Sequence, residues 1–318
     1  MKRLIAPILV AFAATAALAQ GYPSKPIKLI VPLAAAGTGD TLARTVGEAM
    51  AKELGQPVVI ENKPGAGGLV GTEMVAAAAP DGYTLLAVSP SHVINPALHA
   101  KKTYDPLKDF ETITVMANTH QVIVAHPSTP ASTLKELIDY AKKNPGKLTY
   151  GSAGLGSATH LNMELFKSMA GVDILHVPYK GSTQARQDVL SGQVHLAMDG
   201  LLPVQPLIKD GRLKALALTS SSRSQSNPEI PTIAEAGVPG YQSDTWYGLL
   251  VPAKTPRDIV MKLQQAAVKA LRSTEVRDRL ARLGAEAVGN TTEEFSRLLV
   301  QEQKTWAKVV KDSGAKAE

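Results

Sequence analysis

The sequence predicts an α/β protein of two lobes, each built on a mostly parallel sheet that is flanked by helices. Short apolar runs typical of buried strands alternate with segments of helical periodicity along most of the 318 residues. The alternation falls into two successive series, separated by a loop-rich stretch between Asn95 and Phe110. The chain is long enough for two domains of ordinary size. Because β-α-β units cross over with one hand, each series should form a parallel sheet with helices on its faces.

The composition is that of a globular protein without a disulfide or metal framework. Hydrophobic residues make up 44% of the chain and charged residues 19%, which allows a substantial core. The sequence has 0 cysteines, so disulfides, thiolate nucleophiles and cysteine metal sites are excluded. The net charge of +6 is scattered and aromatic residues are only 4%, so we do not expect a nucleic acid partner. We also expect no cofactor and no metal, because the 7 histidines are dispersed and the H-E-x-x-H motif is absent.

Residues 1–19 are predicted to be a cleavable signal peptide and not part of the fold. Lys2 and Arg3 precede an apolar, alanine-rich stretch that ends in Ala17-Leu18-Ala19, a small-x-small cleavage pattern. A membrane anchor is the alternative, but this stretch is short for a span of about 20 residues. We therefore expect the mature protein to be exported to the periplasm.

The first series of elements ends two of its strands in loops that are suited to a ligand. Its strands and helices are expected, in order, at residues 27–31, 42–54, 58–60, 69–79 and 83–88. The loop Ala34–Asp40 follows the first strand, and the loop Ser89–His92 follows the third. Because ligands of open α/β sheets bind beyond the carboxyl ends of the strands, both loops should border one site. The glycine-rich turn Asn62–Gly68 could also cradle a ligand, but a tight strand-to-helix connection explains it more simply.

The second series and the tail of the chain complete the two lobes. The series is expected at residues 113–117, 121–125, 134–144, 148–150, 161–169, 174–177, 183–190, 193–198, 204–209 and 213–218. The tail adds a strand and helices at 241–250, 256–271, 274–283 and 292–310, which should pack back on the first series. The first lobe would then comprise residues 20–120 and 243–318, and the second lobe residues 121–242. Two chain crossings between lobes would leave a cleft.

The stretch Tyr150–Leu161 is the strongest candidate for a ligand-binding turn. A short strand ends at Tyr150, and a turn rich in glycine and serine leads into a helix. A helix N-terminus offers N–H groups without intrahelical partners and the positive end of the helix dipole, which favours an anion. Plain helix capping explains the turn equally well. The stretch matches neither the dinucleotide fingerprint nor the phosphate loop.

No catalytic arrangement is evident, so we expect a binding protein and not an enzyme. The G-x-S-x-G nucleophile elbow of exported hydrolases is absent. Ser152 and His160 are both on one turn and the helix after it, which is poor geometry for a nucleophile and its base.

A set of short motifs runs in order through essentially the whole chain. They are Tyr22-Pro-Ser-Lys-Pro-Ile, Gly55-Gln-Pro-Val-Val, Pro64-Gly-Ala-Gly-Gly, Pro80-Asp-Gly-Tyr-Thr-Leu-Leu, Tyr104-Asp-Pro, Tyr150-Gly-Ser-Ala-Gly, His160-Leu, Glu164-Leu-Phe-Lys, His176-Val-Pro-Tyr-Lys-Gly, Gly192-Gln-Val, Pro231-Thr, Gly284-Ala-Glu and Glu293-Glu-Phe. In this combination they are highly specific. With them the chain resembles the Bug-type solute receptors of tripartite tricarboxylate transporters.

The resemblance implies a two-lobed, flytrap-like periplasmic-binding-protein fold. It also implies that a monomeric receptor binds a small organic acid, a mono-, di- or tricarboxylate, and delivers it to membrane transporter subunits. In the family two loops hold the ligand carboxylate, partly through ordered waters, and these match residues 33–40 and 152–160 here. A sensory binding protein that signals to a membrane receptor without transport is the alternative.

The chain departs from the family pattern at positions near the expected pocket. Family members usually carry an aromatic residue where Leu33 stands, glycine where Ala36 stands and often asparagine where Gly200 stands. Thr38-Gly39 replaces a commoner Pro-Thr pair. The identity of the ligand therefore does not follow from the resemblance.

The predicted ligand-binding residues come from both lobes. They are Ala35, Gly37, Thr38, Gly39, Asp40, Ser89, Ser91, Ser152, Ala153, Ser157, His160 and Asp199. Because these loops contain no Arg or Lys, we expect backbone dipoles and waters to hold the anion, and not a guanidinium clamp.

Three of these residues have alternative roles. Asp40 could face an ammonium group of a ligand, but it could also cap its helix. His160 could reach the pocket or bond to the local backbone. Asp199, if ionised in the cleft, would repel a second carboxylate, whereas a loop aspartate would point to water.

Overall fold

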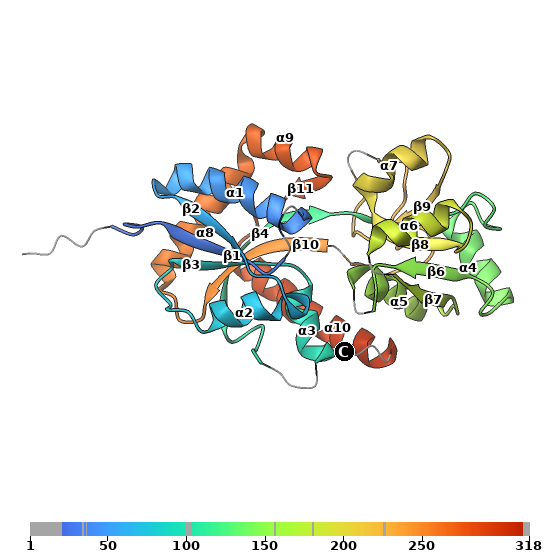
Figure 1. Ribbon diagram of the computed structural model, residues 1–318, viewed down its shortest axis with the longest axis horizontal. Helices are drawn as coiled ribbons and strands as arrows, with labels where there is room; N and C mark the ends of the chain where they lie inside the picture. The colour runs from blue at the N-terminus through green and yellow to red at the C-terminus, as the bar shows by residue number, and fades with distance from the viewer. Residues whose placement is uncertain are drawn as a thin grey trace, which may run out of the picture.

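The computed structural model describes residues 21–33, 35, 37–99, 103–155, 157–179, 181–224, 227–243 and 245–313. The predicted signal peptide, residues 1–19, lies outside the described residues. The chain forms two sheets that lie side by side, each with helices on its faces (Figure 1). We use first lobe and second lobe for these two sheets with the helices packed on them. The predicted two-lobed α/β fold is confirmed. The expectation that each sheet is mostly parallel is wrong, because the strands β10 (Thr245–Pro252) and β5 (Gln121–Ala125) pair antiparallel with both of their neighbours.

The sheet of the first lobe has the strand order β11-β4-β10-β3-β1-β2. Its strands are β1 (Ile27–Val31), β2 (Val58–Asn62), β3 (Thr84–Val88), β4 (Phe110–Thr119), β10 (Thr245–Pro252) and β11 (Ala285–Ala287). Strands β2, β1 and β3 pair in parallel, while β10 lies antiparallel between β3 and β4. A strand from late in the sequence therefore lies in the middle of the first sheet.

The sheet of the second lobe has the strand order β7-β6-β8-β5-β9. Its strands are β5 (Gln121–Ala125), β6 (Thr149–Ser152), β7 (Leu175–Pro178), β8 (Leu196–Gly200) and β9 (Lys214–Leu218). Strand β6 pairs in parallel with β7 and β8, and β5 runs antiparallel to both of its neighbours. The carboxyl ends of β6 and β8 consequently lie at the same edge of the sheet.

Helices cover both faces of each sheet. They are α1 (Thr38–Leu54), α2 (Leu69–Ala76) after a short 3-10 turn (Ala66–Gly68), α3 (Ser91–Leu98), α4 (Leu134–Lys143), α5 (Ala158–Ala170), α6 (Ser182–Leu190), α7 (Leu201–Lys209), α8 (Arg257–Arg272), α9 (Thr274–Arg282) and α10 (Thr292–Ser313). Strand β1 illustrates why helices must cover both faces of the sheet, because its apolar side chains are buried on both. Ile27, Leu29 and Val31 join the core under α1 and α8, whereas Ile30 joins the core on the opposite face.

One expectation about the first lobe is wrong, and one of its strands was not expected. Residues Ser91–His92 do not belong to an outgoing loop, because α3 begins at Ser91. The helix tolerates Pro96. Proline has no N–H to donate to the carbonyl of His92, and this carbonyl instead accepts a hydrogen bond from the Tyr104 hydroxyl at 2.7 Å. The short strand β11 was not predicted either, because three residues are too few to show a periodicity.

The chain crosses between the sheets twice, after β4 and before β10. The predicted boundaries at residues 120/121 and 242/243 fall at these crossings. The helix α10 packs against α3 in the first lobe and α5 in the second, and its Trp306 lies in a core cluster that contains residues of both lobes. Because α10 and this cluster join the two lobes, the division of the chain at residues 120/121 and 242/243 stays a prediction.

Candidate functional site

A cleft of about 430 Å³ lies between the lobes and is lined from both sides. The first lobe contributes Leu33 from the loop after β1, and Ser89 and Ser91 from the end of β3 and the start of α3. The second lobe contributes Ser157 and Ala158, at the N-terminus of α5. The loops that follow β1 and β3 thus border one site, together with the turn that follows β6. Although the sequence favoured a plain strand-to-helix connection after β2, that turn also lines the cleft, with Pro64, Gly65, Gly67 and Gly68.

None of the described residues that line this cleft carries a charge. The lining consists of proline, glycine, serine, threonine, asparagine, glutamine, alanine, leucine, isoleucine and tyrosine. An anion in the cleft would therefore be held by hydroxyls, amides and helix dipoles. Such neutral donors suit a small carboxylate. The shape of the cleft would then decide which other atoms the ligand can carry.

The N-terminus of α1 has no side-chain cap. Gly37 is its N-cap residue, and Gly37, Thr38 and the preceding Ala35 are exposed. The N–H groups of a first helical turn have no acceptor within the helix. Ala35, Gly37 and Thr38 follow the cleft residue Leu33 in the sequence but do not line the cleft themselves, so their contact with a ligand stays a prediction.

Asp40 lies in the first turn of α1 and is not the N-cap residue. Its side chain is buried, and its carboxylate accepts hydrogen bonds from Arg44 Nε at 3.0 Å and from Asn62 Nδ2 at 2.9 Å. The same amide of Asn62 donates to the carbonyl of Leu33 at 3.2 Å. Asp40 therefore fastens the loop after β1 to β2, which is neither the N-cap role nor the ammonium contact considered above.

Gly39 leaves room for two side chains that line the cleft. A Cβ atom on Gly39 would lie 2.4 Å from Leu33 Cδ1 and 3.0 Å from Tyr247 Cε1. We expect Gly39→Ala to displace both side chains, to destabilise the protein by about 1–2 kcal/mol and to weaken ligand binding. Chemical denaturation and calorimetric titration would measure the two effects. Gly47→Ala on the same helix, whose Cβ would face Ile60 at 3.1 Å, should leave the affinity unchanged; equal affinities in all three proteins would contradict this prediction.

The turn before α5 is held by its own hydroxyl groups. Ser157 is the N-cap residue, accepts from the His160 N–H at 3.3 Å and donates to the Gly154 carbonyl at 2.7 Å. The N–H of Ala153 donates to Thr159 Oγ1 at 2.9 Å. Ser157 borders the cleft, whereas Ala153 shapes the turn. Both the capping and the anion-binding explanations of this turn thus find residues that fit them.

Ser152 and His160 point into a buried stack behind the turn. Ser152 Oγ lies 2.6 Å from His176 Nε2, and the rings of His160 and His176 stack with centroids 4.2 Å apart. Tyr150 stacks on the other side of His176 at 4.8 Å. Burial lowers the pKa of His160, and burial followed by the charge of His160 lowers the pKa of His176 to about 4.

The stack makes His160 a supporting residue of the turn. The His160 ring packs on His176 and is not among the described residues that line the cleft, whereas its bond to the local backbone stays a prediction. His176 was noted only as part of a motif. Its pairing with Tyr150 on adjacent parallel strands could have indicated the contact, had the register been known.

Asp199 is paired inside the second lobe, which corrects both expectations for this residue. Its carboxylate accepts from Arg186 Nε at 2.7 Å and Arg186 Nη2 at 3.2 Å, and it also accepts from the N–H of Gly200 at 2.8 Å. The side chain is 3% exposed. It neither points to water nor presents an uncompensated charge to a ligand. The sequence did not indicate Arg186 as the partner of Asp199, because Arg186 lies within α6 and not in a loop.

Sequence reasoning missed lining residues that come from the chain crossings. Gln121 begins β5, and Thr245 and Tyr247 begin β10. Burial raises the pKa of Tyr247 to about 12, so its phenol is neutral, and its hydroxyl makes no hydrogen bond to any described residue. The polar residue Gln121 at the start of the otherwise apolar strand Gln121–Ala125 is the sequence feature that could have predicted a contact with the cleft.

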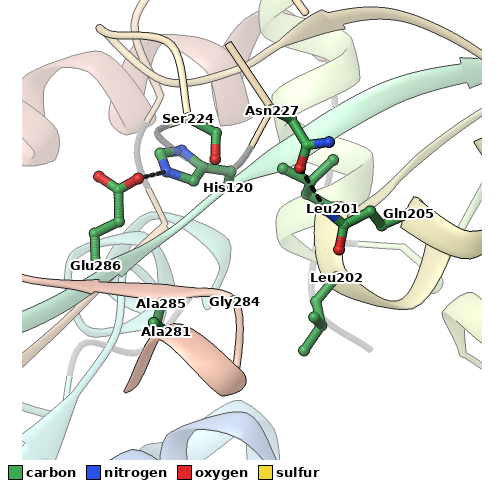
Figure 2. A pocket seen from close by; sticks show the side chains of 10 residues that line it. All are labelled: His120, Leu201, Leu202, Gln205, Ser224, Asn227, Ala281, Gly284, Ala285 and Glu286. Atoms are coloured by element: carbon green, nitrogen blue, oxygen red, sulfur yellow. Dashed lines mark hydrogen bonds and ion pairs between the residues drawn. The ribbon is translucent and has the colours of Figure 1, made fainter. Parts of the chain in front are cut away.

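A second, smaller pocket of about 150 Å³ also lies between the lobes (Figure 2). His120 Nε2 lies 3.0 Å from Glu286 Oε1, and Gln205 Nε2 donates to Asn227 Oδ1 at 2.8 Å. Leu202 of the second lobe closes on Gly284, where a Cβ would lie 2.7 Å from the Leu202 Cβ. Because this pocket is much smaller than the cleft of about 430 Å³, we take the larger cleft as the candidate ligand site.

No helix within the described ranges has the length and apolar character that a membrane crossing requires.

Comparison with known proteins identifies related receptors. The family model described as "Tripartite tricarboxylate transporter family receptor" matches residues 42–315. Protein BugT of Bordetella pertussis is 36% identical over 323 residues, which cover 99% of each chain. The structure of Rhodopseudomonas palustris MatC with bound malate is 35% identical with a TM-score of 0.74, covering 91% of this chain and 100% of MatC. The structure of R. palustris Rpa4515 with adipate is 36% identical with a TM-score of 0.77, covering 93% and 99%.

Proposed function

Because this chain belongs to the receptor family of tripartite tricarboxylate transporters, as a Bug-type member, we propose that it binds a small organic acid in the interlobe cleft. The family consists of solute-binding receptors and not of enzymes. We also propose that the mature protein acts in the periplasm, after removal of residues 1–19, and that it delivers its ligand to membrane transporter subunits.

One observation carries the proposal. A cleft lined from both lobes has no charged side chain among its described residues, and three helices begin at its border, α2, α3 and α5. Helix N-termini stabilise anions through unpaired N–H groups and the helix dipole. The adipate and malate named for the two R. palustris structures are small carboxylates of a size that suits such a cleft.

Closure of the lobes would complete the site. Donors from one lobe alone leave much of a small acid in water, whereas rotation about the two crossings would bring the second set of donors onto it. The ligand would then favour the closed form by the difference between its affinities for the closed and open forms. A membrane partner could distinguish loaded from empty receptor by the changed relation of the lobes.

A thermal-shift screen of the mature protein tests the proposal. The panel contains adipate, malate, succinate and citrate, with glucose and ATP as controls. An acid that binds only the folded protein adds about 2.7 kcal/mol at a hundredfold excess over its Kd, which gives a clear rise in melting temperature. Tryptophan fluorescence provides a second readout, because Trp246 lies between the cleft residues Thr245 and Tyr247 in the sequence. The 2 tryptophans, Trp246 and Trp306, both donate a hydrogen bond to Glu302. Stabilisation by glucose or ATP alone would reject the proposal.

A further inference from the structure

We infer that Gln121 donates a hydrogen bond to the bound ligand, and that the buried residues Asn162 and Ser243 hold its amide in the donating orientation. The inference rests on the proposed function, since it requires a small acid in the interlobe cleft. It adds a residue that selects the ligand and a physical link from that residue to both chain crossings.

Gln121 stands where the two lobes meet. It is the first residue of β5, directly after the first crossing, and its side chain lines the cleft while the residue as a whole is 7% exposed. Its carboxamide is therefore available to a ligand in the cleft.

Hydrogen bonds to Asn162 determine which end of the carboxamide faces the cleft. Asn162 Nδ2 donates to Gln121 Oε1 at 2.7 Å, and Ser243 Oγ donates to Asn162 Oδ1 at 2.6 Å. Asn162 and Ser243 are each 2% exposed. The three side chains form a directed chain of donors from Ser243 through Asn162 to Gln121.

The opposite direction of this chain is unfavourable. If both amides were turned over, Asn162 Nδ2 would donate to Ser243 Oγ, and the buried Ser243 hydroxyl would have no acceptor among the described residues. An unsatisfied buried donor costs about 1–3 kcal/mol. Ser243 therefore selects the orientation in which Gln121 turns its oxygen inward.

The nitrogen of Gln121 is consequently the end that faces the ligand. Gln121 Nε2 makes no hydrogen bond to a described residue. Among the described residues, the side-chain polar atoms that are both fully buried and without a hydrogen bond belong to His92 and His120. Since Gln121 Nε2 also has no hydrogen bond but is not one of these atoms, it is not fully buried and keeps access to the cleft. A neutral N–H₂ donor in an uncharged cleft selects a ligand with an oxygen acceptor at this point, such as a carboxylate, hydroxyl or carbonyl group.

The same three residues link the ligand to the motion of the lobes. Gln121 follows the first crossing, and Ser243 precedes the second. Asn162 lies one helical turn after Ala158, which lines the cleft at the start of α5. A ligand that bonds Gln121 thus acts on a buried network that contains both crossings and the anion-binding turn.

Two near-isosteric substitutions test the inference by calorimetric titration of the mature protein with adipate, or with the acid of the panel that stabilises it most. Gln121→Glu keeps an oxygen for Asn162 and replaces the donor by an anionic oxygen, so the affinity should fall about 10- to 100-fold or more. Asn162→Asp does not touch the ligand but removes the donor that holds Gln121, so Gln121 should turn its nitrogen inward and the affinity should fall comparably. Gln301→Glu on the exposed face of α10 makes the same change of charge and should retain the wild-type affinity.

The double variant and the free protein complete the test. If Asn162 acts through Gln121, the losses of the two single variants will not add in the double variant. In ¹⁵N spectra of the unliganded protein, the side-chain amide protons of Asn162 should be protected from exchange and those of Gln121 should not. Wild-type affinity in Gln121→Glu, or the reverse pattern of protection, would overturn the inference. Failure of every acid to bind the wild-type protein would instead reject the proposed function, and the exchange pattern would still test the orientation of the amides.

Discussion

Replacing Arg186 by leucine should lower the free energy of unfolding by about 3–5 kcal/mol, because a buried carboxylate then loses its counter-ion. Asp199 lies on β8, which has β6 on one side and β5 on the other, and its side chain is 3% exposed. Among the described residues, Arg186 donates two hydrogen bonds to this carboxylate, at 2.7 and 3.2 Å, and the N–H of Gly200 donates a third. One backbone N–H cannot compensate for a carboxylate that is removed from water.

Urea denaturation followed by tryptophan fluorescence measures this loss. Arg212→Leu removes an exposed arginine of the same lobe and should change stability by less than about 0.5 kcal/mol. Asp199→Asn combined with Arg186→Leu removes both charges, so it should recover much of the loss of the single variant. If Arg186→Leu is no less stable than Arg212→Leu, the pair does not stabilise the fold as its geometry indicates.

Most elements could be predicted because the local pattern and the tertiary structure agree. Strands β1 and β3 are apolar runs that end at proline or serine, and both strands are buried in the first sheet as expected. The exceptions depend on distant contacts. The helix α3 accommodates Pro96 because Tyr104 supplies a donor, and β11 exists only because it pairs with β4. Neither contact leaves a periodic signal in the sequence.

The cleft could be located from the sequence more easily than its contacts could be named. The glycine-rich turn after β6 indicated the N-terminus of α5, which borders the cleft, and the turn after β1 indicated the loop that contributes Leu33. Which hydroxyl faces the ligand depends on neighbours from other strands: Ser157 lines the cleft, whereas Ser152 turns to His176 on β7. Gln121 and Tyr247 were missed because their position follows from how the chain crosses between lobes, and no local pattern encodes that.

Acidification should destabilise the protein by about 3 kcal/mol between neutral pH and pH 4 through His92 alone. Burial lowers the pKa of His92 from its ordinary value of 6.5 to about 4. Between these two values the unfolded chain binds a proton that the folded chain does not bind. The stability is therefore nearly complete above pH 6.5, falls as the pH decreases through the window and levels off only below pH 4, where the folded chain binds the proton as well. His176, whose pKa is also lowered to about 4, should add a smaller loss because it is only partly buried.

Equilibrium unfolding in urea at pH 7, 6, 5 and 4 measures this dependence. The window from pH 6.5 to 5 is the most informative, because the carboxylates whose pKa is lowered, such as Glu48 and Glu235, are still ionised there. His92→Phe keeps an aromatic ring between Tyr104 and Phe110 and removes the titrating group. It should be less stable than the wild-type protein at pH 7, because the Pro106 carbonyl loses its donor, yet its stability should depend less on pH. A slope between pH 6.5 and 5 as steep as that of the wild-type protein would show that His92 is not the group that titrates.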